Sequence, residues 1–483
     1  MNLKVVSKFN LQFQGELQNR FGFDLKTFIN SIALLTPEES HRINPYLFSQ
    51  RFNIAPDIAV ELFIQGAHLR LFEIIWNQLC PGCGGAEYSV PRIQDLKPSG
   101  THCTICDLDI ESNLDEQIEV YFQLSSEMIP KPWDVNQNPE TFRSFFFSPN
   151  FVRSPELTTY SKERLVKISI LAPGESVTLP FKPQTNAKLY RALSVKNHSQ
   201  ALLKVKPGGK TKIQLNLGVD GFAPQEAEIS DQEVDLKITN QTSEKFPLTL
   251  IKTDFDILHS IIKQYPNQQK QFFTGRDLIN CQTFRELFKF PELPKDFFMP
   301  TKSISVLFTD LQGSTELYSQ LGDIHAYQKV RNHLDELISK ARKHSGAVVK
   351  TMGDSVMATF SKPELALKAA FDILGGFSHS EINLQPKPLV RLGIHEGPAL
   401  VVNSESQLDF FGQTINLTAR IMEHVKAGEI GVSETFFSKP EIQLLLKSQA
   451  LQNTSQICRF KGIESPCQIH VIHALSSAFK QVS

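Results

Sequence analysis

The chain of 483 residues is long enough for about two to four domains, and an apolar content of 41% fits globular folding. The formal net charge is −1, so no basic field over the whole chain favours a nucleic acid or an anionic membrane surface as partner. The sequence has neither an apolar run of transmembrane length nor the apolar core of a signal peptide at its start. We therefore expect no membrane span and a cytoplasmic protein.

The first segment, residues 1–79, reads as mostly helical. Apolar residues recur at helical spacing, and Pro45 and Pro56 stand where helices commonly begin. Short helices in succession fit either a winged-helix-like arrangement or a small helical packing unit. Basic residues are not clustered on the third helical stretch, so we favour the packing unit and expect no nucleic-acid partner.

Two Cys-x-x-Cys pairs define the next segment, residues 80–110. They are Cys80 with Cys83 and Cys103 with Cys106. Pairs at this separation are typical of a zinc ribbon, in which each pair donates two thiolates to one tetrahedral ion. A redox pair and free cysteines are the alternatives, but neither explains two pairs at this spacing. Four thiolates leave no open coordination position, so we expect a structural Zn²⁺ rather than a catalytic one.

The pattern changes twice before the C-terminal region begins. Residues 115–250 contain short alternating runs such as IEVYFQL, RLVKISI and TKIQLNL, separated by Gly, Pro, Asn and Ser, which predicts a β-sandwich-like domain. The Phe-rich stretch 142–151 is expected to be core or a loop anchor. Residues 251–297 turn helical again and end among prolines, which indicates a helical linker.

From residue 298 strands and helices alternate. Ile304, Val306 and Phe308 form an alternating apolar run, which predicts a strand that ends near Asp310. The helix that follows should bury a face and end at Gly346; we expect that face to contain Ile324, Tyr327, Val330, Leu334, Leu337, Ile338 and Ala341.

The rest of this pattern completes a βαββαβ order. Residues 347–360 predict a hairpin that turns at Gly353-Asp354. A helix up to Gly375-Gly376 and the strand LVRLGIH follow. We therefore predict an α+β multidomain protein whose C-terminal part is a ferredoxin-like palm.

Asp310 and Asp354 stand at the ends of neighbouring predicted strands. Two carboxylates held in this way can share divalent metal ions, although turn capping is an alternative role for each of them. The segment after Asp310 offers successive backbone N–H groups around Gly313, followed by Ser314 and Thr315, and such a concavity suits a phosphate group.

Four ordered motifs resemble the class III nucleotidyl cyclase catalytic domain. They are FTDLQGST (308–315), KTMGD (350–354), the D-x-x-G-x-x-x-N-x-x-x-R pattern over 409–420, and RFKGIE (459–464). Several correctly ordered motifs match by chance far more rarely than one does. The resemblance covers residues 298–475, which we take as the limits of this domain. The region ahead of it resembles the uncharacterised segment found ahead of some bacterial cyclase domains.

The resemblance implies an adenylate cyclase that makes 3′,5′-cyclic AMP and pyrophosphate from ATP in intracellular signalling, regulated by its N-terminal region. It implies two Mg²⁺ or Mn²⁺ ions per active site, held by Asp310, Leu311 and Asp354. Asn416 would orient the ribose and Arg420 would stabilise the charged α-phosphate. Lys461 would hold the terminal phosphates, while Arg391 and His395 are expected to be structural.

Purine choice depends on Lys350 and Asp409. Lys350 can donate to adenine N1 and Asp409 can accept from the 6-amino group, whereas guanine-selecting members of the family typically carry Glu and Cys there. ATP is therefore expected over GTP. A guanylate cyclase and a catalytically silent nucleotide-binding sensor are the alternatives. In this family the residues of one site come from opposite subunits, which implies a homodimer with shared sites.

Overall fold

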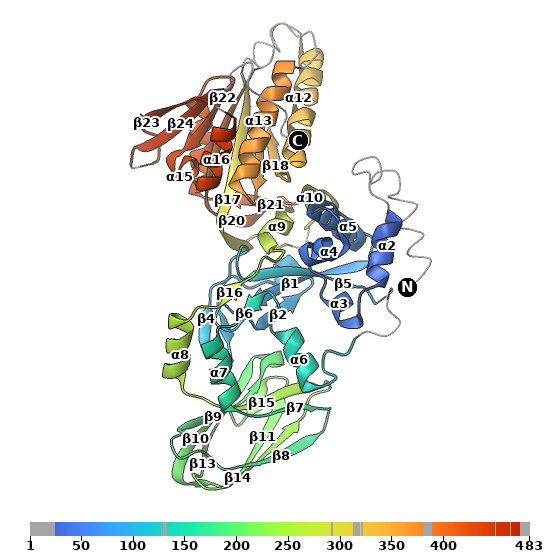
Figure 1. Cartoon of the computed structure of the whole chain (residues 1–483), viewed down its shortest axis with the longest axis vertical. Coiled ribbons are helices and arrows are strands. Elements are labelled where there is room, and N and C mark those ends of the chain that lie inside the picture. Colours follow the sequence, from blue (N-terminus) through green and yellow to red (C-terminus); the bar gives the residue numbers. More distant parts are fainter. Residues whose placement is uncertain are drawn as a thin grey trace. The chain divides into compact units, whose positions relative to one another are not determined.

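The computed structural model describes residues 25–126, 128, 133–290, 293–312, 319, 322–379, 389–449, 451–463 and 465–473. The chain divides into two compact units (Figure 1). The first unit comprises Met1–Asn53, Arg70–Ser112 and Gln117–Phe273, and the second unit comprises Ile54–Leu69, Asn113–Glu116 and Thr274–Ser483. Both units mix helices and strands. Among the described residues, no helix combines the length and apolar character needed to cross a bilayer.

Short capped helices open the described chain. They are α2 (Leu25–Ala33), α3 (Pro37–His41), α4 (Pro45–Phe52) and α5 (Pro56–His68). The predicted helix starts at Pro45 and Pro56 are confirmed. Thr36 and Glu39 form a capping box at α3, and the Asn44 side chain accepts from the N–H of Tyr46 at α4.

Helical structure does not extend to residue 79, so that expectation is wrong. The chain leaves α5 at His68, takes a positive φ of 63° at Arg70, and continues as strand β1 (Phe72–Leu79). β1 pairs with β2 (Ala86–Val90) and β5 (Ile118–Leu124) in a sheet of order β2-β1-β5. The run Ile74-Ile75-Trp76 is β-branched and aromatic, which suits a pleated surface covered on both sides.

Two further sheets of the first unit face each other across one apolar core. The sheet orders are β13-β10-β9-β15-β7 and β12-β11-β14-β8. Leu203 and Leu250 from one sheet and Leu215, Leu236 and Ile238 from the other belong to a single buried cluster. The strands are β7 (Leu165–Leu171), β8 (Ser176–Phe181), β9 (Leu189–Ser194), β10 (Ser199–Lys210), β11 (Lys212–Gly218), β12 (Gly221–Ala223), β13 (Glu226–Ile229), β14 (Val234–Asn240) and β15 (Phe246–Lys252).

Helices interrupt the region that the sequence pattern assigned to strands. α6 (Pro139–Phe146) begins after an Asn138 cap and α7 (Pro155–Arg164) after a Ser154 cap. Phe146 is buried, as expected for the Phe-rich stretch. The Asn-Pro and Ser-Pro pairs are common to turns and to helix starts, so the sequence pattern alone did not separate the two.

The linker is helical in three pieces. α8 (Phe255–Gln264) lies in the first unit, where its Leu258 packs with Leu157 and Tyr160 of α7. α9 (Gly275–Ile279) and α10 (Gln282–Leu287) lie in the second unit. Between α8 and α9 in sequence, β16 (Gln268–Gln269) pairs with β6 (Phe151–Val152).

The second unit contains the predicted βαββαβ order, which is confirmed. Its elements are β17 (Phe298–Gln312), α12 (Asp323–Lys343), β18 (Ala347–Met352), β19 (Ser355–Phe360), α13 (Pro363–His379), β20 (Leu389–Ser404), β21 (Gln407–Phe411), α14 (Gln413–Glu423), β22 (Glu429–Ser433), α15 (Glu434–Phe437), α16 (Pro440–Ser448), β23 (Asn453–Cys458) and β24 (Cys467–His473). The sheet order is β18-β19-β17-β20-β22-β24-β23, and β21 pairs with β20.

The sheet is covered on both faces. Residues of α12, α13 and α16 share one core cluster with inward residues of the strands, and Figure 1 shows these helices beside the sheet. α14 packs on the other face, where a Cβ at Gly393 of β20 would lie 2.7 Å from Met422. Only a glycine permits this close approach of helix and strand. This packing sets the distance between α14 and β20.

Two details of the predicted helices are wrong. Ile324 and Tyr327 are 73% and 57% exposed, whereas Val330 of the same predicted face is buried. The first turn of α12 therefore extends beyond the sheet that covers the rest of the helix. α13 also continues through Gly375-Gly376 to His379, because two glycines lower helix stability without ending a helix that is packed on a core.

Candidate functional site

Asp310 lies near the end of β17, beside the turn that carries Asp354. The Ser355 hydroxyl donates to Asp310 Oδ1 at 2.8 Å, and Ser355 follows Asp354 directly. Gly353 has a φ of 65°, which lets the β18–β19 hairpin turn tightly at this point. The structure thus brings the Asp310 carboxylate next to the hairpin tip, as the sequence predicts.

Oxygen ligands of this kind fit a divalent cation. Asp310 accepts from Ser355 and from Nε of Arg391, the latter at 2.8 Å, and a carboxylate offers about four lone-pair sites. Acceptor capacity therefore remains for a metal, and hard oxygen donors suit Mg²⁺ or Mn²⁺. Leu311 is buried beside Asp310. The predicted phosphate-binding residues Gly313, Ser314 and Thr315 lie outside the described residues.

Lys350 and Asp409, the predicted purine-reading residues, contact each other. Lys350 Nζ lies 2.7 Å from Asp409 Oδ2, and the Phe410 N–H donates to Asp409 Oδ1 at 2.7 Å. Lys350 belongs to β18 and Asp409 to β21. The two side chains are 39% and 17% exposed, so the pair remains open to a ligand.

α14 carries the two predicted catalytic residues on one helix. Asn416 is exposed, and Arg420 Nη1 donates to the Glu423 carboxylate at 2.8 Å. Arg391 Nη1 donates to the Glu423 carbonyl at 3.3 Å, so one guanidinium contacts both Asp310 and the end of α14. Lys461 is exposed in the loop between β23 and β24.

The two residues expected to be structural differ in their surroundings. His395 Nδ1 lies 2.7 Å from the Ser433 hydroxyl, and burial lowers the pKa of His395 to about 4. Its imidazole is therefore neutral at physiological pH. Arg391 is directly opposite Asp310 in the β17–β20 register, so it also orients a candidate metal ligand. The sequence signal for this role is the position of Arg391 at the start of its strand.

The four paired cysteines form one buried cluster. The sulfur atoms of Cys80, Cys83, Cys103 and Cys106 all lie within 4.8 Å of one another. Cys83 Sγ and Cys103 Sγ are 3.8 Å apart. A tetrahedral zinc site with Zn–S bonds of about 2.3 Å requires sulfur separations of about 3.8 Å. The donor set and its spacing therefore fit Zn²⁺.

Backbone geometry supports this cluster. The N–H groups of Gly82 and Cys106 donate to the sulfurs of Cys80 and Cys103, at 3.3 and 3.4 Å. Cys103 ends β3 (Thr101–Cys103), which pairs with β4 (Leu108–Ile110). Gly84 has a φ of +70°, and a Cβ there would lie 2.5 Å from Phe151. Glycine is therefore required in the first cysteine loop.

Sequence patterns missed the residues that hold the second cysteine loop. Arg191 of β9 is 1% exposed and donates to the carbonyls of Thr104 and Ile105, at 2.7 and 2.8 Å. His259 of α8 contacts the Cys106 carbonyl at 2.8 Å. Both lie far from the cysteines in sequence, and no local signal identifies them.

Comparison with known proteins assigns both parts of the chain. Residues 26–286 match the family model described as a family of unknown function, DUF5939. Residues 298–474 match the adenylate and guanylate cyclase catalytic domain, which confirms the resemblance inferred from the motifs.

Curated relatives match part of the chain. An adenylate cyclase of Lachancea kluyveri is 25% identical over 243 residues, which are 45% of this chain and 13% of that protein. An adenylate cyclase of Podospora anserina is 30% identical over 169 residues, 31% of this chain and 8% of that protein. The chain thus spans only a small part of the length of these relatives. A solved structure of the adenylyl cyclase CyaB from P. aeruginosa is 23% identical, covers 38% of this chain and all of its own (100%), and has a TM-score of 0.33.

Proposed function

Since the chain belongs to the DUF5939 family and its residues 298–474 match the adenylate and guanylate cyclase catalytic domain, we propose that it is an adenylate cyclase. It converts ATP to 3′,5′-cyclic AMP and pyrophosphate. One observation carries the choice of ATP, namely that Lys350 and Asp409 lie 2.7 Å apart as a donor and acceptor pair. Adenine presents an acceptor at N1 beside a donor at the 6-amino group, so the two side chains can exchange their mutual contact for the base.

In the reaction the ribose 3′-oxygen attacks the α-phosphorus, its proton leaves, and the bond to the pyrophosphate oxygen breaks. Two bound Mg²⁺ or Mn²⁺ ions would lower the pKa of the 3′-hydroxyl and neutralise charge on the leaving group. Asp310 and Asp354, with Leu311, would hold these ions, while Arg391 and Ser355 fix the Asp310 carboxylate.

The remaining site residues act on the ribose and the phosphates. Asn416 orients the ribose, and Arg420 donates to the α-phosphate after leaving its contact with Glu423. Lys461 binds the terminal phosphates as a mobile point charge. The predicted loop of Gly313, Ser314 and Thr315 completes the phosphate contacts.

We propose a homodimer in which each site draws residues from both subunits. Two large apolar side chains next to the purine-reading pair support an apolar interface: Phe411 is 67% and Met352 is 44% exposed. Phe411 follows Asp409 on β21, and Met352 follows Lys350 on β18. The interface would shield the nucleotide from water on one side.

The rest of the chain is proposed to regulate this domain. The cysteine cluster is the structural Zn²⁺ site of a zinc ribbon over residues 80–110, and the two facing sheets support a β-sandwich-like domain within 115–250. The linker is 251–297 and the catalytic domain is 298–475. The preceding helices are a packing unit in this proposal.

The test uses the full chain with Mn²⁺ or Mg²⁺ and equimolar ATP and GTP, and quantifies both cyclic products. Cyclic AMP in excess is the expected result. Cyclic GMP in excess would still support a cyclase reaction but would refute the assignment of ATP as the preferred substrate. A wild-type chain that makes no more product than Asp354→Ala would refute the cyclase proposal itself.

A further inference from the structure

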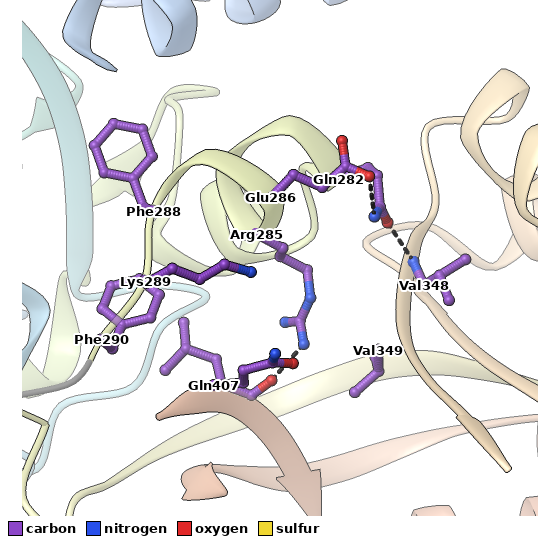
Figure 2. A pocket seen from close by; sticks show the side chains of 10 residues that line it. Gln282, Arg285, Glu286, Phe288, Lys289, Phe290, Val348, Val349 and Gln407 are labelled. Carbon is purple, nitrogen blue, oxygen red and sulfur yellow. Dashed lines mark hydrogen bonds between the residues drawn. The ribbon is translucent and has the colours of Figure 1, made fainter. Parts of the chain in front are cut away.

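Helix α10 contacts β18 close to Lys350. The side-chain carbonyl of Gln282 accepts a hydrogen bond from the Val348 N–H at 2.7 Å (Figure 2). The register between β18 and β19 shifts between Val348 and Lys350, which marks a β-bulge. A bulge redirects the side chains that follow it. Gln282 thus holds the backbone at the point that sets the direction of Lys350.

The same helix contacts β21 next to Asp409. Arg285 Nη2 donates to the Leu408 carbonyl, and Nη1 donates to the Ile279 carbonyl at 3.4 Å. Burial lowers the pKa of Arg285 to about 10, while the Asp409 carboxylate acts in the opposite direction. The guanidinium is therefore charged at neutral pH and lies near Asp409. One turn of α10 thus contacts both strands of the purine-reading pair.

A network within the second unit orients Gln282. Its Nε2 donates to Glu286 Oε1 at 2.9 Å, and Glu286 also pairs with Arg342 of α12. Because the amide nitrogen is engaged by Glu286, the amide oxygen faces Val348. Gln282 and Glu286 are one helical turn apart, so this arrangement is built into α10.

An open pocket separates part of α10 from β18 and β21. A cavity of about 130 Å³ lies between α10, β18 and β21, lined by Gln282, Arg285, Val349, Gln407 and neighbouring residues. Figure 2 shows Arg285 crossing from the helix toward β21 beside this space. A cavity lacks the dispersion contacts of a filled core. The two polar contacts therefore bridge the helix to both strands beside this pocket.

We propose that Gln282 and Arg285 are positioning residues that set the spacing of Lys350 and Asp409, and thereby the purine preference of the site. This inference rests on the proposed cyclase function and extends it. α10 lies at the end of the region matched to DUF5939, which reaches residue 286. A signal that displaces α10 would change purine recognition before it changed the metal site.

The test measures kcat and KM for ATP and for GTP in the full-length chain. Arg285→Met and Gln282→Leu should each lower kcat/KM for ATP about tenfold, mainly through KM, because a pair at the wrong spacing satisfies adenine poorly. Turnover of GTP should change less than about twofold, so selectivity falls. Arg285→Lys keeps a charged donor and should restore part of the preference. Lys289→Met, which lines the same cavity, is the matched control.

Hydrogen exchange of the same variants separates this inference from the cyclase proposal. We expect faster amide exchange over 347–352 and 407–411 and unchanged exchange in β22 and β24. Gln282→Leu supplies this readout if Arg285→Met does not fold. A wild-type chain without either product would refute the cyclase proposal, and the exchange data would still decide the positioning. Equal losses for ATP and GTP, or unchanged exchange in both strands, would overturn the inference.

Discussion

Asp310 and Arg391 lie directly opposite each other on β17 and β20, and Arg391 Nε donates to Asp310 Oδ2 at 2.8 Å. The same guanidinium donates to the Glu423 carbonyl, and the Glu423 carboxylate accepts from Arg420. A candidate metal ligand and a candidate catalytic arginine are thus connected through one side chain and one helix end.

Arg391→Met should lower kcat of the cyclase at least about tenfold, because Asp310 loses the donor that fixes its rotamer. Initial rates at saturating ATP across a range of Mn²⁺ concentrations measure this loss. Arg391→Lys keeps a positive charge but lacks the planar guanidinium, so its kcat should lie between those of the wild type and Arg391→Met. Wild-type kcat in Arg391→Met would show that Asp310 is oriented by other contacts.

Asp354→Ala should abolish turnover, with a loss of at least about 100-fold, because one of the two carboxylates proposed to hold the metal ions is removed. The fold should persist, since Asp354 sits at a half-buried turn rather than in the core. Activity and thermal melting of the same preparation test this. Asp335→Ala, at an exposed position of α12, is the matched control and should retain activity.

Lys350→Ala and Asp409→Ala should not act additively on kcat/KM for ATP. Each single change leaves a charged partner without its contact, so the double variant should lose less than the product of the single losses. A double-mutant cycle measures this coupling.

Replacing the proposed purine-reading pair should change the choice of purine and leave the cyclisation reaction itself in place. Lys350→Glu with Asp409→Cys should shift the ATP to GTP ratio by about 100-fold toward GTP, because the donor and acceptor order is reversed. Competition between the two nucleotides in one reaction reports the ratio. An unchanged ratio would place purine recognition elsewhere.

Purified chain should contain about one equivalent of zinc, and Cys103→Ser should lose it. The melting temperature should fall with it, because three buried thiols and an added hydroxyl then share a site without an ion. Cys467→Ser, outside the cluster, is the control. Metal-free wild-type protein with the same melting temperature would contradict the assignment.

Acid should destabilise the second unit through His395. Burial lowers the pKa of His395 to about 4 from its usual 6.5, so between these values the unfolded chain binds more protons than the folded one. The stability contribution is complete above about pH 6.5 and is lost as pH falls toward 4. Denaturant unfolding at several pH values should show this slope. His395→Gln should reduce it but not remove it, because burial also lowers the pKa of His333 to about 4.

Sequence reasoning worked where the chemistry is local. Period-two alternation located β17, and Gly353-Asp354 located the hairpin, so the approach of Asp310 and the turn was predictable. The contact between Lys350 and Asp409 depends on how distant strands meet, which no local pattern encodes. For the same reason the roles of Gln282 and Arg191 were invisible.

The errors have physical causes of their own. The strand Phe72–Leu79 is buried along most of its length on both faces, and periodicity does not separate such a strand from a buried helix. Ile324 satisfies the helical period of α12 but lies beyond the sheet that would cover it. Helical spacing shows which residues share a face, whereas burial depends on where the neighbouring element ends.

Arg191 makes the cysteine cluster and the facing sheets energetically interdependent. The buried guanidinium of this β9 residue donates to two carbonyls of the second cysteine loop and to the side chains of Thr253 and Gln200. If that loop opened, the buried cation would lose these two carbonyl acceptors, at a cost of about 1–3 kcal/mol each. Local opening of the loop is thus suppressed by the sheets, and the first unit should behave as a single cooperative folding block rather than as separate modules.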